Sequence, residues 1–202
     1  DQVIALMHER NLVPFVDMAY QGFDQGIDED AIAIRKLAAS PIRNFLVANS
    51  FSKSFSLYGE RVGALTVVSD SAEESGRVQS QVKRLIRANY SSPSFHGAAL
   101  VAGVLNDGGL RRQWEDELGG WRTRIHALRE GLVERLAAHG ATGFDFIRHQ
   151  AGMFSYSGLS RAQVDRLREE FGIYAVGTGR ICVAGLNREN LDYVAEAIAK
   201  VA

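Results

Sequence analysis

The sequence has little of what several classes of protein require. It contains one cysteine, Cys182, so no disulfide can form within the chain, and a cytosolic setting is the default expectation. No apolar run approaches the roughly 20 residues that cross a bilayer, and no signal peptide is visible. Lysine and arginine number 23 against 24 aspartates and glutamates, which gives no electrostatic footprint for nucleic acid or an anionic membrane. We therefore expect a cytoplasmic protein that binds neither of them.

Two further absences concern metals and the start of the chain. The histidines show no metal-ligand spacing, and we predict no metal site. They are His8, His96, His126, His139 and His149. The chain opens inside a helical pattern, DQVIALMHER, with no initiator methionine. This opening predicts that the sequence is a portion of a longer protein.

The first part of the chain alternates helices and strands. Apolar spacing predicts helices at 2–10 and 28–39, the second with acidic residues in its first turn. Short apolar runs predict strands at 12–16, 43–48 and 62–69. A strand, a helix and a strand at this spacing form a βαβ unit, so we predict a mainly parallel sheet in an α/β domain.

The second part of the chain has an α+β texture. Helices are predicted at 71–88 and 96–105, and a long amphipathic helix spans 110–139 with an apolar stripe that indicates core packing. Short strands then alternate with helices. The strands are expected at 153–158, 173–176 and 180–185, and the helices at 160–171 and 187–201. We place a domain boundary within the long helix, between a domain of residues 1–120 and a smaller one of residues 121–202.

One segment carries most of the candidate chemistry: NSFSKSFSLYGERVG, residues 49–63. A strand leads into a loop of hydroxyls around Lys53, and Arg61 follows eight residues later. Ligands of α/β sheets lie beyond the carboxyl ends of the strands. Asp17 ends the preceding strand of the same βαβ unit, so we expect Asp17 and Lys53 to face one pocket.

These residue types fit the needs of a pyridoxal phosphate (PLP) site. Such a site needs an amine for an imine with the cofactor, a carboxylate beside the pyridine nitrogen, and a phenol near the ring oxygen. It also needs hydroxyls and a guanidinium for a dianionic phosphate. Lys53 is the candidate amine, Asp17 the carboxylate and Tyr20 the phenol. Ser50 and Ser52 are the candidate hydroxyls, and Arg61 is the candidate guanidinium.

Five ordered blocks together carry a family resemblance: DMAYQGF (17–23), NSFSKSFSLYGERVG (49–63), IRANYSSP (86–93), GMFSYSGL (152–159) and GRICVAGL (179–186). The chain resembles class I aminotransferases of the aspartate and aromatic amino-acid type along nearly its whole length. The resemblance implies the fold-type I architecture of PLP-dependent transferases. Residues 1–120 would then be the C-terminal part of the large PLP-binding domain, and residues 121–202 the small domain.

The resemblance also implies roles for the cofactor-binding residues. Lys53 matches the Schiff-base lysine that also shuttles a proton. Asp17 matches the carboxylate paired with the pyridinium, and Tyr20 the phenol on the ring oxygen. Ser50, Ser52 and Arg61 lie in the phosphate-binding segment.

Further roles concern the substrate. Arg180 matches the arginine that binds the substrate α-carboxylate, and Phe154 an aromatic near the substrate. Arg87 matches the arginine that reaches into the neighbouring subunit's site of a homodimer and binds a distal carboxylate. The implied reaction moves the amino group of tyrosine, phenylalanine or aspartate to a 2-oxo acid such as 2-oxoglutarate. Activity would need the family's N-terminal half, which supplies further groups of the site.

Three alternatives stay open at this point. The chain could be an inactive fragment, or a non-catalytic binding module of the same fold. Within PLP chemistry, a lyase acting at the β-carbon uses the same lysine. Ser50-x-x-Lys53 also matches the S-x-x-K motif of a Ser-Lys acyl-transfer enzyme, but the S-D-N and K-T-G elements of that class are missing.

Overall fold

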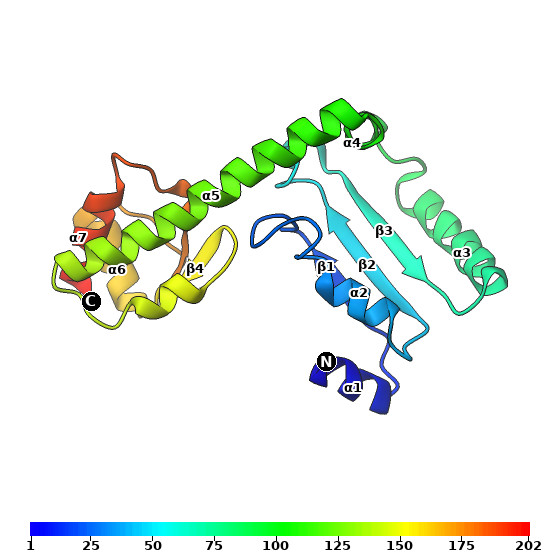
Figure 1. Cartoon of the computed structure of the whole chain (residues 1–202), viewed down its shortest axis with the longest axis horizontal. Helices are drawn as coiled ribbons and strands as arrows, with labels where there is room; N and C mark the ends of the chain where they lie inside the picture. The colour runs from blue at the N-terminus through cyan, green and yellow to red at the C-terminus, as the bar shows by residue number, and fades with distance from the viewer. The chain divides into compact units, whose positions relative to one another are not determined.

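A three-stranded sheet organises the first part of the chain. The computed structural model describes residues 1–202, which form two units, residues 1–118 and residues 119–202. In the first unit the strands lie in the order β1 (Phe15–Met18), β2 (Phe45–Ser50) and β3 (Gly63–Val68) (Figure 1). The βαβ prediction is right for β1 and β2, which are parallel.

The prediction of parallel strands is wrong for β3, which runs antiparallel to β2. The reason lies in the connection between them. Residues 51–62 contain only the short 3-10 helix η1 (Tyr58–Glu60) and no crossover helix. Two parallel neighbours are usually joined by a crossover helix, and this connection contains none, so the chain turns back beside β2.

One face of the sheet carries the core of the first unit. The helices α1 (Gln2–Glu9) and α2 (Ile32–Ala38) contribute apolar side chains to it. Its buried members are Leu37, Ile42, Phe45 and Val47, and the half-buried side chains packed on them are Ile4, Met7, Val16, Met18, Ile34 and Val68. Side chains alternate between faces along a strand, so Asp17 belongs to the opposite face, where it is exposed.

The helix predicted at 28–39 begins four residues later than expected, at Ile32. The acidic residues before it therefore do not lie in a helical first turn, and that part of the prediction is wrong. Asp30 instead accepts hydrogen bonds from backbone N–H groups of the loop that follows β1. A short carboxylate that binds nearby backbone amides competes with helix formation, which explains the late start.

Three helices complete the first unit: α3 (Ala72–Tyr90), α4 (His96–Asn106) and the first part of α5 (Gly108–Ala138). Ser71 caps α3 by accepting the N–H of Glu74, as expected for a serine before an acidic first turn. None of the helices in the chain combines the length and the apolar character that a bilayer crossing needs.

The second unit packs helices around the C-terminal part of α5. A two-stranded antiparallel ribbon joins β4 (Phe154–Tyr156) and β5 (Arg180–Cys182). The remaining elements are η2 (Asp145–His149), α6 (Arg161–Phe171), η3 (Val183–Gly185) and α7 (Leu191–Val201). The predicted apolar stripe of α5 is buried within this unit at Ile125, Leu128, Leu132 and Leu136.

Residues 173–176 form no strand, so that prediction is wrong. Their backbone groups are used elsewhere. The N–H of Ile173 binds the carbonyl of Leu167 at the end of α6, and the N–H of Val176 binds the carbonyl of Arg180 across the turn that leads into β5. The two units divide within α5, between Leu118 and Gly119. Their assignment to a large and a small domain of a longer protein stays a prediction.

Candidate functional site

The carboxyl ends of β1 and β2 lie side by side. Because the two strands are parallel neighbours, Asp17 pairs in register with Ala48, and Asn49 pairs with Met18. Adjacent strands are about 4.8 Å apart, so the loops that follow them begin at one edge of the sheet. Asp17 itself lies within β1, one residue before its end, rather than after the strand as the sequence suggested.

Lys53 and Tyr20 meet at this edge. The Nζ of Lys53 lies 4.8 Å from the centroid of the Tyr20 ring, within the range of a cation–π contact. Tyr20 follows β1 by two residues and Lys53 follows β2 by three. Lys53 is half-buried, so its amine is partly shielded from solvent yet reachable.

Arg61 lies close to Tyr58 at the end of the same loop. Its Nη1 donates to the carbonyl of Tyr58 at 2.9 Å, and its guanidinium carbon lies 5.5 Å from the Tyr58 ring centroid. The backbone of Arg61 is left-handed, with φ of 55°, which is strained for a residue with a Cβ. Strain of this kind concentrates at functional sites, so the conformation supports a role for Arg61 beyond packing.

Tyr58 is a residue whose position sequence reasoning undervalued. Its exposed ring lies within 6 Å of both cations of the loop, with the Nζ of Lys53 at 5.7 Å. The sequence analysis assigned Tyr58 no role. Its place between Lys53 and Arg61, in a segment rich in hydroxyls, is the signal that could have identified it.

The serines around Lys53 differ in exposure. Ser50 is half-buried at the end of β2, and its Oγ accepts the N–H of Ser52 at 3.3 Å. Ser52 and Ser54 are buried. The segment consists of turns closed by backbone hydrogen bonds, from the N–H of Phe55 to the carbonyl of Phe51 and from the N–H of Ser56 to that of Lys53. Ser50-x-x-Lys53 therefore does not open a helix, as the acyl-transfer motif would.

The loop after β1 is held by Asp30. Its carboxylate accepts the backbone N–H of Gly22 at 2.7 Å and of Gln25 at 2.9 Å, with longer bonds from Asp24 and Gly26. Partial burial raises the pKa of the Asp30 carboxyl, but the four N–H donors outweigh this effect and hold the pKa below its ordinary value. The charged carboxylate thus fixes the loop that begins at Tyr20.

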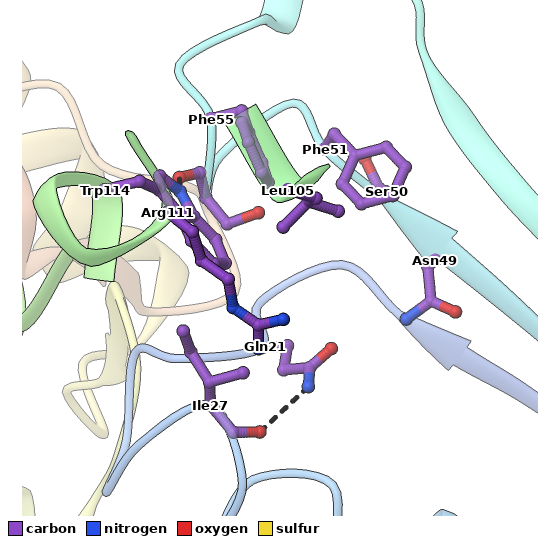
Figure 2. A pocket seen from close by; sticks show the side chains of 10 residues that line it. Gln21, Ile27, Asn49, Ser50, Phe51, Phe55, Leu105, Arg111 and Trp114 are labelled. Carbon is purple, nitrogen blue, oxygen red and sulfur yellow. Dashed lines mark hydrogen bonds between the residues drawn. The ribbon is translucent and has the colours of Figure 1, made fainter. Parts of the chain in front are cut away.

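A pocket of about 240 Å³ opens beside the Lys53 loop (Figure 2). Aromatic rings lie on one side of it, and the loop that follows β1 lies on the other. Its lining residues are Gln21, Ile27, Asn49, Ser50, Phe51, Ser54, Phe55, Leu105, Arg111 and Trp114. Trp114, which sequence reasoning assigned no role, donates its indole N–H to the carbonyl of Ser54 at 2.6 Å.

In the second unit the structure brings together Arg180 and Phe154. The guanidinium carbon of Arg180 lies 4.9 Å from the Phe154 ring centroid, although the two residues belong to different strands of the ribbon. Gly179, directly before Arg180, has φ of +83°, and a Cβ there would lie 2.7 Å from the carbonyl oxygen of Leu159. Only glycine fits this close approach, which fixes where Arg180 leaves the turn.

Arg129 is a second residue that nothing in the sequence singles out. It is 1% exposed, and it donates to the Oγ of Ser155 and the carbonyl of Gly152. These bonds hold the segment that carries Phe154. A lone arginine in an amphipathic helix usually lies at the surface, so no signal short of the fold could have found it.

Arg87 belongs to a helix rather than to the loops that follow β1 and β2. It occupies the last turn of α3, where it is exposed. Exposed apolar side chains lie near it along the chain, at Leu85, Tyr90 and Phe95.

Comparisons with known proteins give a consistent result. Residues 1–198 match the sequence family described as aminotransferase class I and II. The chain is 58% identical over 201 residues to the aspartate aminotransferase of Pseudomonas aeruginosa, a match that covers 99% of this chain and 50% of that protein. It is 54% identical over 202 residues to the aromatic-amino-acid aminotransferase of Escherichia coli, with 100% of this chain and 51% of that protein covered.

Solved structures agree with these relatives. The aromatic-amino-acid aminotransferase from Burkholderia pseudomallei, covalently bound to pyridoxal phosphate, superposes with a TM-score of 0.96 at 62% identity. That match covers 99% of this chain and 50% of the other. A mitochondrial aspartate aminotransferase from Trypanosoma brucei superposes equally well, with a TM-score of 0.96 at 44% identity, over 100% of this chain and 53% of the other. The chain thus spans about half the length of the curated relatives it matches.

Proposed function

The chain belongs to the class I and II aminotransferases, and we propose that it contributes the lysine-bearing half of an enzyme that moves an amino group between amino acids and 2-oxo acids. The donors would be aromatic amino acids such as tyrosine and phenylalanine, or aspartate, and the acceptor an oxo acid such as 2-oxoglutarate. The single observation that carries the proposal is the meeting of Lys53 and Tyr20, with 4.8 Å between amine and ring centroid, at the shared edge of two parallel strands.

The residues present fit pyridoxal phosphate by their chemistry. An amine, a carboxylate and a phenol lie on or after neighbouring strand ends, at Lys53, Asp17 and Tyr20. They complement an aldehyde, a pyridine nitrogen and a ring oxygen. Ser50 and Arg61 offer a hydroxyl and a guanidinium for the phosphate, with the buried Ser52 as a further member of that segment.

Each residue would do a distinct task. When bound, the cofactor supplies an electron sink that makes loss of the α-proton feasible. Lys53 would hold the cofactor's aldehyde carbon at rest, then take the proton from the α-carbon of the amino acid with its freed Nζ. Asp17 would hold a proton on the pyridine nitrogen by its negative charge. The amino group would stay with the enzyme after the first 2-oxo acid leaves and would pass to the second in the other half-reaction, so the kinetics would be ping-pong.

Two arginines would select the substrate. Arg180, with Phe154 beside it, would bind the α-carboxylate, because a planar guanidinium forms two parallel hydrogen bonds to a carboxylate. Arg87 would bind the distal carboxylate of aspartate. Relatives named for aspartate and for aromatic amino acids both match the chain strongly, which supports a dual preference.

We also propose a cytoplasmic homodimer with shared sites. The exposed position of Arg87 in the last turn of α3 supports this, because its guanidinium is available to another subunit. The nearby exposed residues Leu85, Tyr90 and Phe95 offer apolar surface of the kind that subunit interfaces bury.

Turnover of the full-length protein tests the function. Tyrosine, phenylalanine and aspartate are each offered with 2-oxoglutarate, and glutamate formation is followed. The Arg87→Ala variant should lose far more activity on aspartate than on phenylalanine, because only aspartate carries a distal carboxylate. Equal loss on both would contradict the role of Arg87. Absence of any transamination would favour the alternative of an inert module, and release of a β-substituent without amino transfer would favour a lyase.

Shared sites have their own test. Lys53→Ala and Arg87→Ala subunits are mixed, unfolded and refolded together, and assayed on aspartate. If Arg87 serves the neighbouring subunit, one site of each hybrid dimer keeps both residues, and random pairing restores about one quarter of wild-type activity. If Arg87 serves its own subunit, no hybrid site is complete and no activity returns.

A further inference from the structure

Trp114 joins α5 to the Lys53 loop by a hydrogen bond and a ring contact. Its Nε1–H donates to the backbone carbonyl of Ser54 at 2.6 Å, across 60 residues of sequence. Its ring also stacks on Phe55, with centroids 4.5 Å apart and planes 20° from parallel. Phe55 in turn meets Phe51 edge to face at 5.4 Å. Aromatic residues on both sides of Lys53 are thus tied to one helix.

The position of these contacts determines what they can do. Ser54 follows Lys53 directly, and the hydrogen bond to its carbonyl fixes the peptide plane between Ser54 and Phe55, one residue beyond the peptide bond of the lysine. Ser54 is 7% exposed, which limits the access of water to this hydrogen bond. The turn around Lys53 is also closed by two backbone bonds of 3.1 and 3.2 Å, and the Oγ of Ser50 accepts the N–H of Ser52.

We propose that Trp114 is a positioning residue for Lys53, acting through the Ser54 carbonyl and the Phe55 ring. This inference rests on the proposed function, in which the amine must reach both the cofactor and the substrate α-carbon. A displacement of about 1 Å in a reacting group can cost about 100-fold in rate. Without the indole, the turn would be held by its local hydrogen bonds alone and the Lys53 Cα would be freer to shift, whereas the indole links the turn to α5.

Packing and hydrogen bonding can be separated at this residue. Trp114→Phe keeps an aromatic ring for Phe55 but removes the donor. Replacement of Trp114 by 3-benzothienylalanine keeps the shape of the indole and exchanges only its N–H for sulfur. Trp121, the other tryptophan, lies in the same helix within the second unit, and Trp121→Phe is the matched control.

The first readout needs no cofactor. Amide hydrogen exchange is measured on the full-length, cofactor-free protein. The amides of Phe55 and Ser56 close the turn, and they should exchange about tenfold faster in Trp114→Phe and in the benzothienyl protein than in Trp121→Phe. Amides of β2 should be unchanged, which excludes a global loss of stability as the cause.

The second readout is the split between kcat and KM of the holoenzyme. We expect kcat to fall about tenfold or more for both Trp114 replacements, with the KM for the amino acid within about twofold, because the substrate-binding arginines are untouched. Unchanged exchange, unchanged kcat, or a loss confined to KM would each overturn the inference. Full turnover by Lys53→Ala would instead refute the proposed function itself, whatever Trp114 does.

Discussion

The amine of Lys53 lies 4.8 Å from the ring centroid of Tyr20, although the two residues come from loops after different strands. The parallel pairing of β1 and β2 causes this meeting, because it starts both loops at one edge of the sheet. The loop of Tyr20 is in turn held by the carboxylate of Asp30. One backbone arrangement therefore assembles a lysine and a phenol that lie far apart in the sequence.

Two substitutions of Tyr20 measure the contributions of its ring and its hydroxyl to cofactor binding separately. Tyr20→Phe keeps the cation–π contact and loses one hydrogen bond to the cofactor, so its Kd for pyridoxal phosphate should rise about tenfold. Tyr20→Leu loses the ring as well. Its Kd should rise further, because a cation–π contact worth about 0.5–1 kcal/mol is lost. Absorbance titration of the cofactor-free protein measures both. Equal affinity of the two variants would show that the ring contact contributes nothing.

Arg61 allows backbone strain to be tested apart from charge. Arg61→Gly removes the strain of the left-handed conformation but adds freedom to the unfolded chain, and these opposing terms should leave the unfolding free energy within about 1 kcal/mol of wild type. Loss of the guanidinium should nevertheless weaken cofactor binding about 10- to 100-fold. Urea unfolding and cofactor titration supply the two numbers. Arg61→Lys, which keeps the charge, should bind with intermediate affinity. Unweakened cofactor binding by the glycine variant would remove Arg61 from the phosphate site.

Asp30 should make stability depend on pH in one direction. Its pKa is lower in the folded protein than in the unfolded chain, so its contribution is fully present above the unfolded pKa and is lost as the pH falls through the folded pKa. At pH 7, Asp30→Asn should lower the unfolding free energy by about 1 kcal/mol, a modest value because the group is partly exposed. The difference between variant and wild type should shrink on acidification below about pH 4. A constant difference from neutral pH to about pH 3 would rule out the charged carboxylate as its source.

Arg180 should govern affinity for the amino acid. A lysine cannot form the paired hydrogen bonds of a guanidinium, so Arg180→Lys should raise the KM about 10- to 100-fold for aspartate and phenylalanine alike. Phe154→Leu removes only the ring that lies 4.9 Å from the guanidinium, and its KM should rise less than about tenfold. Steady-state kinetics with both substrates supply the comparison. An unchanged KM in Arg180→Lys would argue against the carboxylate role.

The sequence predicted the elements of the fold more reliably than their connections. Apolar periodicity identified the long helix, found at Gly108–Ala138. Short apolar runs identified the strands that became β1 and β2, although β1 begins three residues later than predicted, at Phe15. The likeness to solved structures confirms the predicted fold class. The direction of β3 was wrong because strand periodicity is the same in both directions, and only the absence of a crossover helix distinguishes them.

The residues of the candidate site were also only partly identifiable from the sequence. Lys53 and Arg61 were selected from their place in the loop after a predicted strand, and the family motif around them then implied their roles, which stay predictions. Trp114 and Arg129 could not be selected, because their importance comes from contacts across 60 and 23 residues that no local pattern encodes. Asp30 was among the acidic residues predicted to lie in the first turn of a helix, but it binds backbone amides of the preceding loop. An acidic residue just before an apolar stripe looks the same in sequence in both cases.

The most direct test is to find where the cofactor attaches. The full-length protein is incubated with pyridoxal phosphate, reduced with borohydride, digested, and its peptides are analysed by mass spectrometry. We predict one phosphopyridoxyl group per chain, on Lys53. In Lys53→Ala, no residue should be labelled at a yield equal to that of Lys53 in the wild type. A label on another lysine, or an undiminished label in Lys53→Ala, would contradict the assignment of Lys53 as the residue that holds the cofactor.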